Sequence, residues 1–287
     1  MAETFATKSY PVEKYASFRP TYPPELYQAI LDYHQGDKNF AIDLGCGTGI
    51  VTTELVRQAE FSYVVGVDPS EAMLDYAKKT SPNAQFVHGR AESLPWVADK
   101  SVDLITAGTA AHWFEPAWWK EAERILKPNG TVAVFIYGGL WPDPSHPKAD
   151  LLRQTMFSFA NELGFSSTGN LICHEMYDGL PLPGGGYPTK LAQHKRIDWN
   201  RQGLGDRLVM ADQMSLRTWR ERVYTYGPAH RWRIENPSKV GNKHFDPIEK
   251  TIESLKLILE IKDDDDEEKK FLCGHSLSIL LFRYENN

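Results

Sequence analysis

Between Phe40 and Tyr137 the sequence alternates five times between a short apolar run and a pattern typical of an amphipathic helix. The apolar runs lie at 40–44, 63–67, 84–88, 102–106 and 131–137. Alternation of this kind, with short links, predicts parallel strands whose connecting helices cover both faces of one sheet. The fold class expected for this chain is therefore α/β.

Composition excludes several other classes of protein. A chain of 287 residues with a formal net charge of −6 and no basic tract longer than a few residues is not expected to bind a nucleic-acid backbone, which requires an excess of grouped Lys and Arg. Three widely separated cysteines exclude a disulfide framework and a CxxC metal site, and they suit a reducing compartment. The longest apolar-leaning stretch, 131–141, is far shorter than the ~20 residues of a membrane span, and no signal peptide is visible. We therefore expect a cytoplasmic protein without a metal, nucleic-acid or membrane partner.

A glycine-rich loop follows the first apolar run and precedes a helical pattern. Gly45, Gly47 and Gly49 occupy the position where glycines let the backbone approach a ligand. The second run ends in Asp68, placed to accept hydrogen bonds from ribose hydroxyls. Asp43, two residues before the first glycine, would repel a pyrophosphate and favour an ammonium or a sulfonium, and the short loop leaves less room for a pyrophosphate. S-adenosylmethionine, cationic and free of phosphate, meets these conditions.

Five motifs in this order resemble the class I S-adenosylmethionine-dependent methyltransferases: DLGCGTG, GVDPS, GRAESLP, DLITAG and LKPNG, over about residues 40–137. The segments YASFRPTYP and AAHWF are similar to the small-molecule branch that contains the trans-aconitate and cantharidin-type methyltransferases. The resemblance implies a Rossmann-like, seven-stranded class I methyltransferase sheet with helices on both faces and a C-terminal substrate-cap insertion. It also implies S-adenosyl-L-methionine as cofactor and S-adenosyl-L-homocysteine as product.

The resemblance implies roles for residues around this cofactor. The glycine loop would contact the methionine part, with Asp43 near its amino group, and Asp68 would hold both ribose hydroxyls. Ala107 would lie below the sulfonium. Arg90 stands where many relatives carry an Asp that faces the adenine amino group. Glu92 therefore becomes the stronger candidate for a contact with the edge of the adenine. The cofactor-binding residues expected are Tyr10, Arg19, Asp43, Gly45, Cys46, Gly47, Gly49, Asp68, Pro69, Met73, Arg90, Ala91, Glu92 and Ala107.

Three regions follow from these assignments. Residues 1–39, rich in aromatic residues and proline, would fold over the cofactor, with Arg19 and Tyr10 closing over its carboxylate. Residues 40–138 would form the S-adenosylmethionine-binding core, and 139–287 a substrate cap followed by the final strands. Within that last region the patterns predict helices over 151–163 and 214–233, strands over 191–199 and 277–284, and a solvated acidic linker at 263–268.

Candidate substrate residues lie in two places. His112 and Trp113 follow the fourth run at the C-terminal edge of the sheet, where reacting groups meet. His112 would be a general base or a hydrogen-bond donor, or else a structural histidine, and Trp113 a pocket wall or part of the core. Trp118 and Trp119 recur at helical spacing, which favours the core.

The second place is an arginine-rich and aromatic segment, 214–233. Arginine binds carboxylates in a bidentate manner, so this segment would act as a lid over an acidic substrate; surface charge on an amphipathic helix is the alternative. The catalytic candidate is His112, and the substrate-binding candidates are Trp113, Arg217, Arg220, Trp219 and Trp232.

The expected reaction is an in-line displacement at the sulfonium methyl group. A carboxylate acceptor is already ionised at neutral pH and needs no base, so O-methylation of an organic acid is the first hypothesis. Alternatives are O-, N- or C-methylation of a phenolic or secondary metabolite with His112 as base, or a methyltransferase fold that binds a ligand without methylating it. Asp43 and the glycine spacing disfavour an NAD-dependent oxidoreductase. The sequence names neither the acceptor nor the oligomeric state.

Overall fold

The computed structural model describes residues 10–58, 61–165, 168–184, 188–201, 208–262 and 269–285, so the predicted acidic linker at 263–268 lies outside it. The strands are β1 (Phe40–Leu44), β2 (Tyr63–Asp68), β3 (Gln85–His88), β4 (Val102–Gly108), β5 (Leu126–Pro142), β6 (Leu191–Trp199), β7 (Val209–Ser215) and β8 (Lys270–Tyr284). The helices are α2 (Val12–Phe18), α3 (Pro24–Tyr33), α4 (Ile50–Arg57), α5 (Glu71–Thr80), the short 3-10 helix η1 (Ala111–Trp113), α6 (Trp118–Ile125), α7 (Ala149–Met156), α8 (Thr168–His174), α9 (Leu216–Tyr224), α10 (Gly227–Glu235) and α11 (Pro247–Leu259).

One mixed sheet organises the described residues, with strand order β3-β2-β1-β4-β5-β8-β6. The first five strands of this path are parallel, and β8 pairs antiparallel with both β5 and β6. The seven-stranded path confirms the predicted α/β fold. An eighth strand, β7, was not predicted and pairs off the path with the first part of β8.

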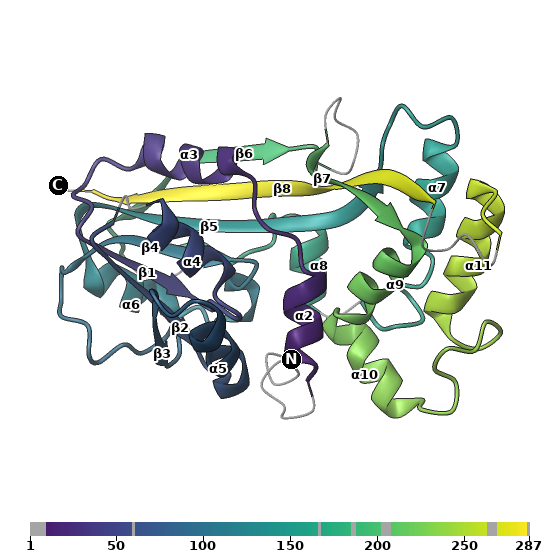
Figure 1. Cartoon of the computed structure of the whole chain (residues 1–287). Helices are drawn as coiled ribbons and strands as arrows, with labels where there is room; N and C mark the ends of the chain where they lie inside the picture. Colours follow the sequence, from purple (N-terminus) through teal and green to yellow (C-terminus); the bar gives the residue numbers. More distant parts are fainter. Residues whose placement is uncertain are drawn as a thin grey trace.

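Two strands are much longer than the sequence patterns predict. Runs were expected at 131–137 and 277–284, but β5 and β8 extend together from the sheet to the region of helices α7, α9, α10 and α11, which we call the cap (Figure 1). Leu140 pairs with His275 and Pro142 with Cys273, so a segment with the composition of a loop gains backbone partners from the far end of the chain. Residues 127–130, whose proline and glycine are typical of a turn, lie inside β5 as an irregularity opposite β4, with Asn129 at a φ of 63°.

The helices of the cap also differ from the prediction. The helix expected over 151–163 ends at Met156, and its aromatic continuation packs as turns against the cap core. The helix expected over 214–233 is two helices, because Gly227 and Pro228 begin a new one; proline favours the first turn of a helix and cannot continue an existing one. Helices α2, α8 and α11 were not predicted.

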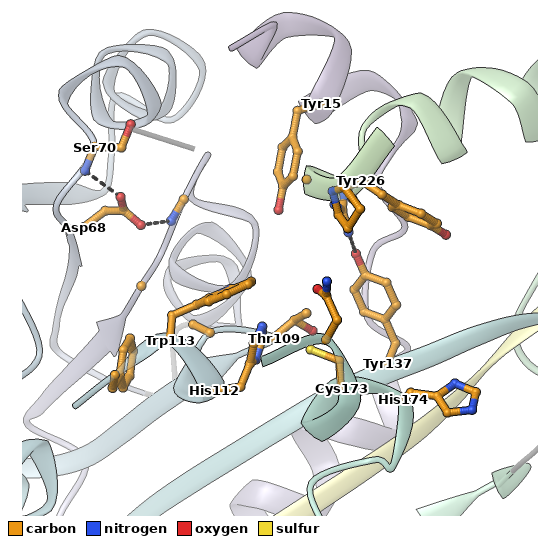
Figure 2. Close-up of a pocket in the computed structure, with 18 of the residues that line it drawn as sticks. Tyr15, Asp68, Ser70, Thr109, His112, Trp113, Tyr137, Cys173, His174 and Tyr226 are labelled. Atoms are coloured by element: carbon orange, nitrogen blue, oxygen red, sulfur yellow. Dashed lines mark hydrogen bonds between the residues drawn. The ribbon is translucent and has the colours of Figure 1, made fainter. Parts of the chain in front are cut away.

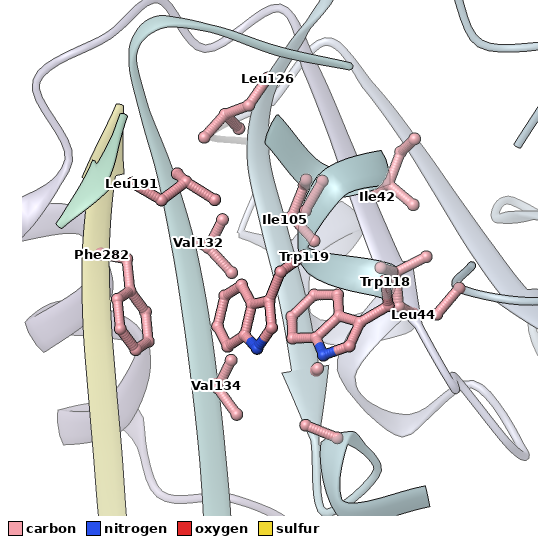
Figure 3. Packing of buried hydrophobic residues seen from close by; sticks show 14 of the residues in the cluster. Ile42, Leu44, Ile105, Trp118, Trp119, Leu126, Val132, Val134, Leu191 and Phe282 are labelled. Atoms are coloured by element: carbon pink, nitrogen blue, oxygen red, sulfur yellow. The ribbon is translucent and has the colours of Figure 1, made fainter. Parts of the chain in front are cut away.

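Hydrophobic clusters cover both faces of the sheet. Side chains of α3 and α4 fill one face. On the other face Trp118 and Trp119 of α6 are each 1% exposed, with ring centroids 4.0 Å apart, which confirms their prediction as core. Trp119 packs edge-to-face on Phe282 of β8 (Figure 3). These hydrophobic clusters thus hold the strands in place, and with them the C-terminal strand ends at which the cavity described below opens.

The cap has a hydrophobic core of its own. Buried side chains from the 157–165 turns, α9, α11 and β7 meet there, and Trp219 is 1% exposed at its centre. Helix α2 contacts α5 of the sheet region on one side and α9 of the cap on the other (Figure 1). In the part of the chain that the structure describes, no helix combines the length and the hydropathy of a membrane span.

Candidate functional site

A cavity of about 470 Å³ opens at the C-terminal ends of β1, β2 and β4 (Figure 2), which is the usual volume of a small-molecule site. One side is formed by the glycine loop and by the residues that follow β2, β3 and β4. The other side comes from the N-terminal segment, the 157–165 turns, α8 and the junction of α9 with α10. The sheet region that carries the glycine loop and the cap therefore line one continuous cavity.

Asp68 joins the end of β2 to the glycine loop. Its carboxylate accepts hydrogen bonds from the backbone N–H groups of Gly47 and Ser70, both at 2.8 Å (Figure 2). Burial raises its pKa, although these two donors oppose the shift. Asp68 and Gly47 both line the cavity.

Two glycines of the loop are required for different reasons. Both have positive φ, 67° at Gly45 and 53° at Gly47, a conformation that costs other residues free energy. A Cβ at Gly45 would lie 2.5 Å from the Cβ of Ala110, whereas a Cβ at Gly47 would enter open space. Gly45 thus permits close packing of the loop, and Gly47 leaves space at the cavity wall.

Asp43 lies beneath the loop and is 1% exposed. Its two carboxylate oxygens accept hydrogen bonds from the hydroxyls of Thr52 at 2.7 Å and Thr106 at 2.9 Å. Burial raises its pKa to about 6 against the effect of these bonds. Asp43 and Cys46 line a smaller adjoining pocket of about 60 Å³, which Arg19 also lines.

Arg19 lines both pockets from the N-terminal segment. Its guanidinium lies between the rings of Tyr15 and Tyr226, at 4.5 and 5.1 Å from their centroids. It donates hydrogen bonds to the hydroxyl of Tyr137 at 2.6 Å and to the carbonyl of Thr225 at 3.1 Å. Among the described residues its Nε has no hydrogen-bond partner. Arg19 therefore keeps one buried donor available for a ligand.

Tyr10 was expected beside Arg19 but does not line the main cavity. It is 4% exposed and donates a 2.6 Å hydrogen bond to the same Thr225 carbonyl. Its ring packs edge-to-face on His230. Tyr10 thus anchors the N-terminal segment to the cap.

The expected adenine-side residues Pro69, Met73, Arg90, Ala91 and Glu92 all line the cavity. Arg90 and Glu92 form an ion pair, with Nε and Oε2 3.4 Å apart. Glu92 also accepts a hydrogen bond from the backbone of Glu115 at 2.8 Å. The structure thus brings the two residues of the unusual Arg-Ala-Glu segment together at the cavity.

Like Tyr10, two further expected cofactor residues, Ala107 and Gly49, line neither the main cavity nor the smaller pocket. Ala107 is fully buried inside β4, and Thr109 and Ala110 line the cavity in its place, because β4 continues to Gly108 before the chain turns toward the site. Gly49 is the N-cap of α4, where a Cβ would lie 2.8 Å from the ring of Phe86. Ala107 and Gly49 therefore act on the site through packing.

His112 and Trp113 line the cavity from η1, as Figure 2 shows. Nδ1 of His112 lies 3.2 Å from the hydroxyl of Tyr177. Burial, and secondarily the charge of Arg19, lower the pKa of His112 to about 3. The imidazole is therefore neutral at physiological pH and a weak base.

The expected arginine lid requires a correction, because none of its four named residues lines the cavity. Arg217 is exposed, and Trp219 is buried in the cap core, against which Trp232 also packs. Arg220 forms an ion pair with Glu249 of α11 at 2.8 Å. The apolar face of α9 packs into the hydrophobic core of the cap. These side chains therefore do not reach the cavity.

Several cavity residues were not among the predicted site residues. They include Tyr15, Thr109, Tyr137, Phe157, Phe165, Asn170, Cys173, His174, Tyr226 and Arg231. Tyr15 belongs to the motif YASFRPTYP, and Tyr226 and Arg231 belong to the arginine-rich segment, so these three had a local sequence indication. The residues of α8 had none, because only the tertiary structure brings that helix to η1.

Comparison with known proteins agrees with this architecture. Residues 42–134 match a family model described as a methyltransferase domain. A candidate methyltransferase of Dictyostelium discoideum is 40% identical over 44% of this chain and 47% of its own length. A candidate S-adenosylmethionine-dependent methyltransferase of Saccharomyces cerevisiae is 31% identical over 47% of this chain and 48% of its own. The chain spans about half the length of the curated relatives that it matches.

A solved structure extends the likeness of fold beyond the matched segment. The structure of a candidate type II methyltransferase from Anaeromyxobacter dehalogenans aligns with a TM-score of 0.68 over 94% of this chain and 100% of that chain, at 20% identity. At this identity the likeness establishes the fold alone. Residues 42–134, which carry the glycine loop and Asp68, are similar to a methyltransferase domain, and the relative from Saccharomyces cerevisiae that shares this segment is described as S-adenosylmethionine-dependent.

Proposed function

We propose that this chain transfers a methyl group from S-adenosylmethionine to a small-molecule acceptor, and that the acceptor atom is a carboxylate oxygen. The observation that carries the proposal is the single cavity shared by the methyltransferase domain and the cap. It offers Asp68 and Gly47 on one side and Arg231 with several aromatic rings on the other. We propose further that the acceptor resembles those of the trans-aconitate and cantharidin-type methyltransferases.

The residues present fit S-adenosylmethionine. The space above Gly47 admits a ligand close to the backbone, and the buried Asp68 carboxylate has lone pairs beyond its two backbone bonds for ribose hydroxyls. In the smaller pocket, the buried Nε of Arg19 and the buried hydroxyl of Thr48 have no hydrogen-bond partner within the described residues. A donor beside the acidic Asp43 suits the carboxylate and ammonium of an amino acid. When bound, the cofactor supplies an electrophilic methyl group on a positively charged sulfur.

The cap side of the cavity suits a compact acidic acceptor. Arg231 of α10 brings a guanidinium to the wall, and Trp113, Phe157 and Phe165 contribute apolar ring surface. A carboxylate is ionised at neutral pH, so the weak basicity of His112 is no obstacle to its methylation. These residues would act by holding the acceptor in line and excluding water.

The three predicted regions enter this proposal as functional parts. Residues 1–39 would cover the cofactor, with Arg19 as the contact; 40–138 would bind it, and 139–287 would form the acceptor side and complete the sheet. We place the activity in small-molecule metabolism of the cytoplasm, where the three free thiols would stay reduced. We propose no nucleic-acid partner, given the net charge of −6.

The test combines binding with turnover. Calorimetry should show tight binding of S-adenosylmethionine and weak or no binding of NAD. A panel of di- and tricarboxylic acids, matched to phenols of similar size, is then screened for release of S-adenosylhomocysteine. Binding of NAD without a response to S-adenosylmethionine would defeat the proposal, and turnover of phenols alone would replace the carboxylate with the phenolic alternative. Binding without turnover of any acceptor would favour the non-methylating alternative.

A further inference from the structure

Tyr177 contacts His112 from outside the cavity. Its hydroxyl lies 3.2 Å from Nδ1 of His112, and the two rings are 5.9 Å apart. Tyr177 is 1% exposed and does not line the cavity, whereas His112 does. Nδ1 therefore faces a buried phenol, and among the described residues Nε2 has no protein partner, which leaves it to the cavity.

The surroundings of the phenol decide which group donates in this bond. The hydroxyl of Tyr177 is buried, and among the described residues its hydrogen-bond partner is Nδ1 of His112. The phenol proton then needs an acceptor, because a buried hydroxyl without one is costly. Within the part of the chain that the structure describes, Nδ1 of His112 is the acceptor in reach. Tyr177 therefore donates to Nδ1, and the proton of the neutral ring is on Nε2.

We propose that Tyr177 is a positioning residue that holds His112 in the Nε2–H tautomer, so that His112 presents a neutral hydrogen-bond donor to the cavity. The tautomer itself follows from the contacts of the protein, and only the identity of the ligand that accepts this bond rests on the proposed function. A neutral N–H donor matches an acceptor oxygen that is already ionised. A phenol or alcohol that must lose a proton would find no base at this position.

The backbone around Tyr177 shows that its orientation is maintained at a cost. Met176 and Tyr177 have φ values of 54° and 69°, and consecutive non-glycine residues with positive φ are strained. Arg196 of β6 donates a 2.8 Å hydrogen bond to the carbonyl of Met176 and forms an ion pair with Asp198 at 3.0 Å. Strand β6 thus stabilises the conformation from which the phenol reaches η1.

The charged and titratable groups around His112 agree with a neutral ring. Arg19 faces it from the end of α2 and disfavours a second positive charge. Cys173 of α8 interacts with Tyr177, and burial raises the pKa of its thiol, so it stays protonated. The indole of Trp113 packs on the imidazole with centroids 4.5 Å apart. Burial and the charge of Arg19 both lower the pKa of His112, so both favour the neutral imidazole.

The direct test is the tautomer. In protein labelled with ¹⁵N-histidine, long-range ¹H–¹⁵N correlation distinguishes a protonated from an unprotonated ring nitrogen, and the His112→Gln variant identifies the signals of His112. We expect an unprotonated Nδ1 and a protonated Nε2 from about pH 5 to about pH 8. A protonated Nδ1, or titration of His112 within this range, would overturn the proposal. This readout needs neither cofactor nor turnover.

Kinetics provide the second test. Glutamine can donate from its amide near the position of Nε2 but cannot act as a base, so His112→Gln should keep most of the activity that His112→Ala loses. Tyr177→Phe should lower kcat/KM for the acceptor by about tenfold to a hundredfold, with the affinity for S-adenosylmethionine unchanged. Equal losses in the Gln and Ala variants, or an unchanged kcat/KM in Tyr177→Phe, would contradict the donor role.

Two controls separate positioning from folding. Tyr63→Phe removes an exposed hydroxyl at the start of β2 that contacts Gln85, and it should change neither kcat/KM nor the NMR signals. Thermal unfolding reports whether Tyr177→Phe folds; if it does not, the tautomer of the unmodified protein and the pair of His112 variants still decide the question. Failure to bind S-adenosylmethionine would refute the proposed function and leave the tautomer result standing.

Discussion

The guanidinium of Arg19 donates a 2.6 Å hydrogen bond to the hydroxyl of Tyr137 and so joins the N-terminal segment to β5. The remaining guanidinium bond goes to the carbonyl of Thr225 in the cap. Arg19 thus links three regions that are distant in sequence, at the boundary between the two pockets. Arg19 and Tyr10 therefore both tie the N-terminal segment to the Thr225 carbonyl of the cap.

Arg19→Ala should weaken binding of S-adenosylmethionine by about tenfold to a hundredfold, because a charge-assisted hydrogen bond is lost in a buried site. Calorimetry measures the change. Tyr10→Phe is the matched control, because it removes the other donor to the Thr225 carbonyl without altering the main cavity. If both variants weaken binding equally, the effect of Arg19 is one of anchoring rather than of contact with the cofactor.

Asp43→Asn should change how stability depends on pH. Burial raises the pKa of Asp43 to about 6, so between about pH 4 and about pH 6 the folded chain binds more protons than the unfolded chain. The contribution of Asp43 to the free energy of unfolding therefore falls as pH rises through this window and is constant above it. Between pH ~5 and neutral pH the decrease amounts to about 1 to 2 kcal/mol.

The Asn variant cannot ionise but can still bond to both Thr52 and Thr106, so this decrease should disappear. Urea unfolding at about pH 5 and about pH 8 measures the difference between variant and parent at each pH. The same difference at both values would mean that Asp43 does not titrate in this range. The variant should also bind S-adenosylmethionine more weakly, because a negative charge near the ammonium is lost.

Gly45→Ala and Gly47→Ala form a matched pair in the glycine loop. Both place a Cβ at positive φ, but only at Gly45 would it clash, 2.5 Å from the Cβ of Ala110. Gly45→Ala should cost about 2 to 4 kcal/mol of stability, and Gly47→Ala about 1 kcal/mol. The Gly47 variant should instead weaken cofactor binding, because its methyl group enters the cavity.

Urea unfolding and calorimetry on both variants separate these effects. The expected result is a crossed pattern, with stability lost at one position and binding lost at the other. A larger loss of stability at Gly47 than at Gly45 would contradict the packing described here.

Arg231→Ala should raise the KM for the acceptor strongly, with a small effect on the affinity for the cofactor, because Arg231 lines the cap side of the cavity. Arg220→Ala is the comparison variant from the same segment. Arg220 pairs with Glu249 outside the cavity, so its loss should lower the Tm and leave the KM unchanged. Turnover assays with varied acceptor test both; a raised KM in Arg220→Ala would restore the lid predicted from the sequence.

Much of the cofactor side was predictable from local sequence. Asp68, Gly47 and Met73 reach the cavity because each follows directly from a strand end or the first turn of the next helix, and parallel strands end at the same edge. Ala107, which the resemblance placed below the sulfonium, lies inside β4 and does not line the cavity. The end of β4 depends on its pairing with β5, which continues to Gly108. Element ends are set by partners as well as by local propensity.

The acceptor side was predicted only in outline. The sequence indicated arginines and aromatic residues at 214–233, but which of them face the cavity depends on the cap core. Trp219 is buried against Phe159, with ring centroids 5.7 Å apart, while Arg217 is exposed and Arg220 pairs with Glu249 of α11. No periodicity within the segment contains that information, because the partners of Trp219 lie elsewhere in the chain.

The alternation of apolar runs and helical patterns predicted the α/β core, and the glycine spacing with the acid at the end of the second strand predicted a cofactor-binding loop, because each of these features depends on neighbours in sequence. Tertiary structure decided the rest. It paired residues 140–142 with the first part of β8, brought α8 against η1, and placed Tyr177 behind His112. The protonation and direction of a buried histidine depend on groups that only folding brings within hydrogen-bond distance.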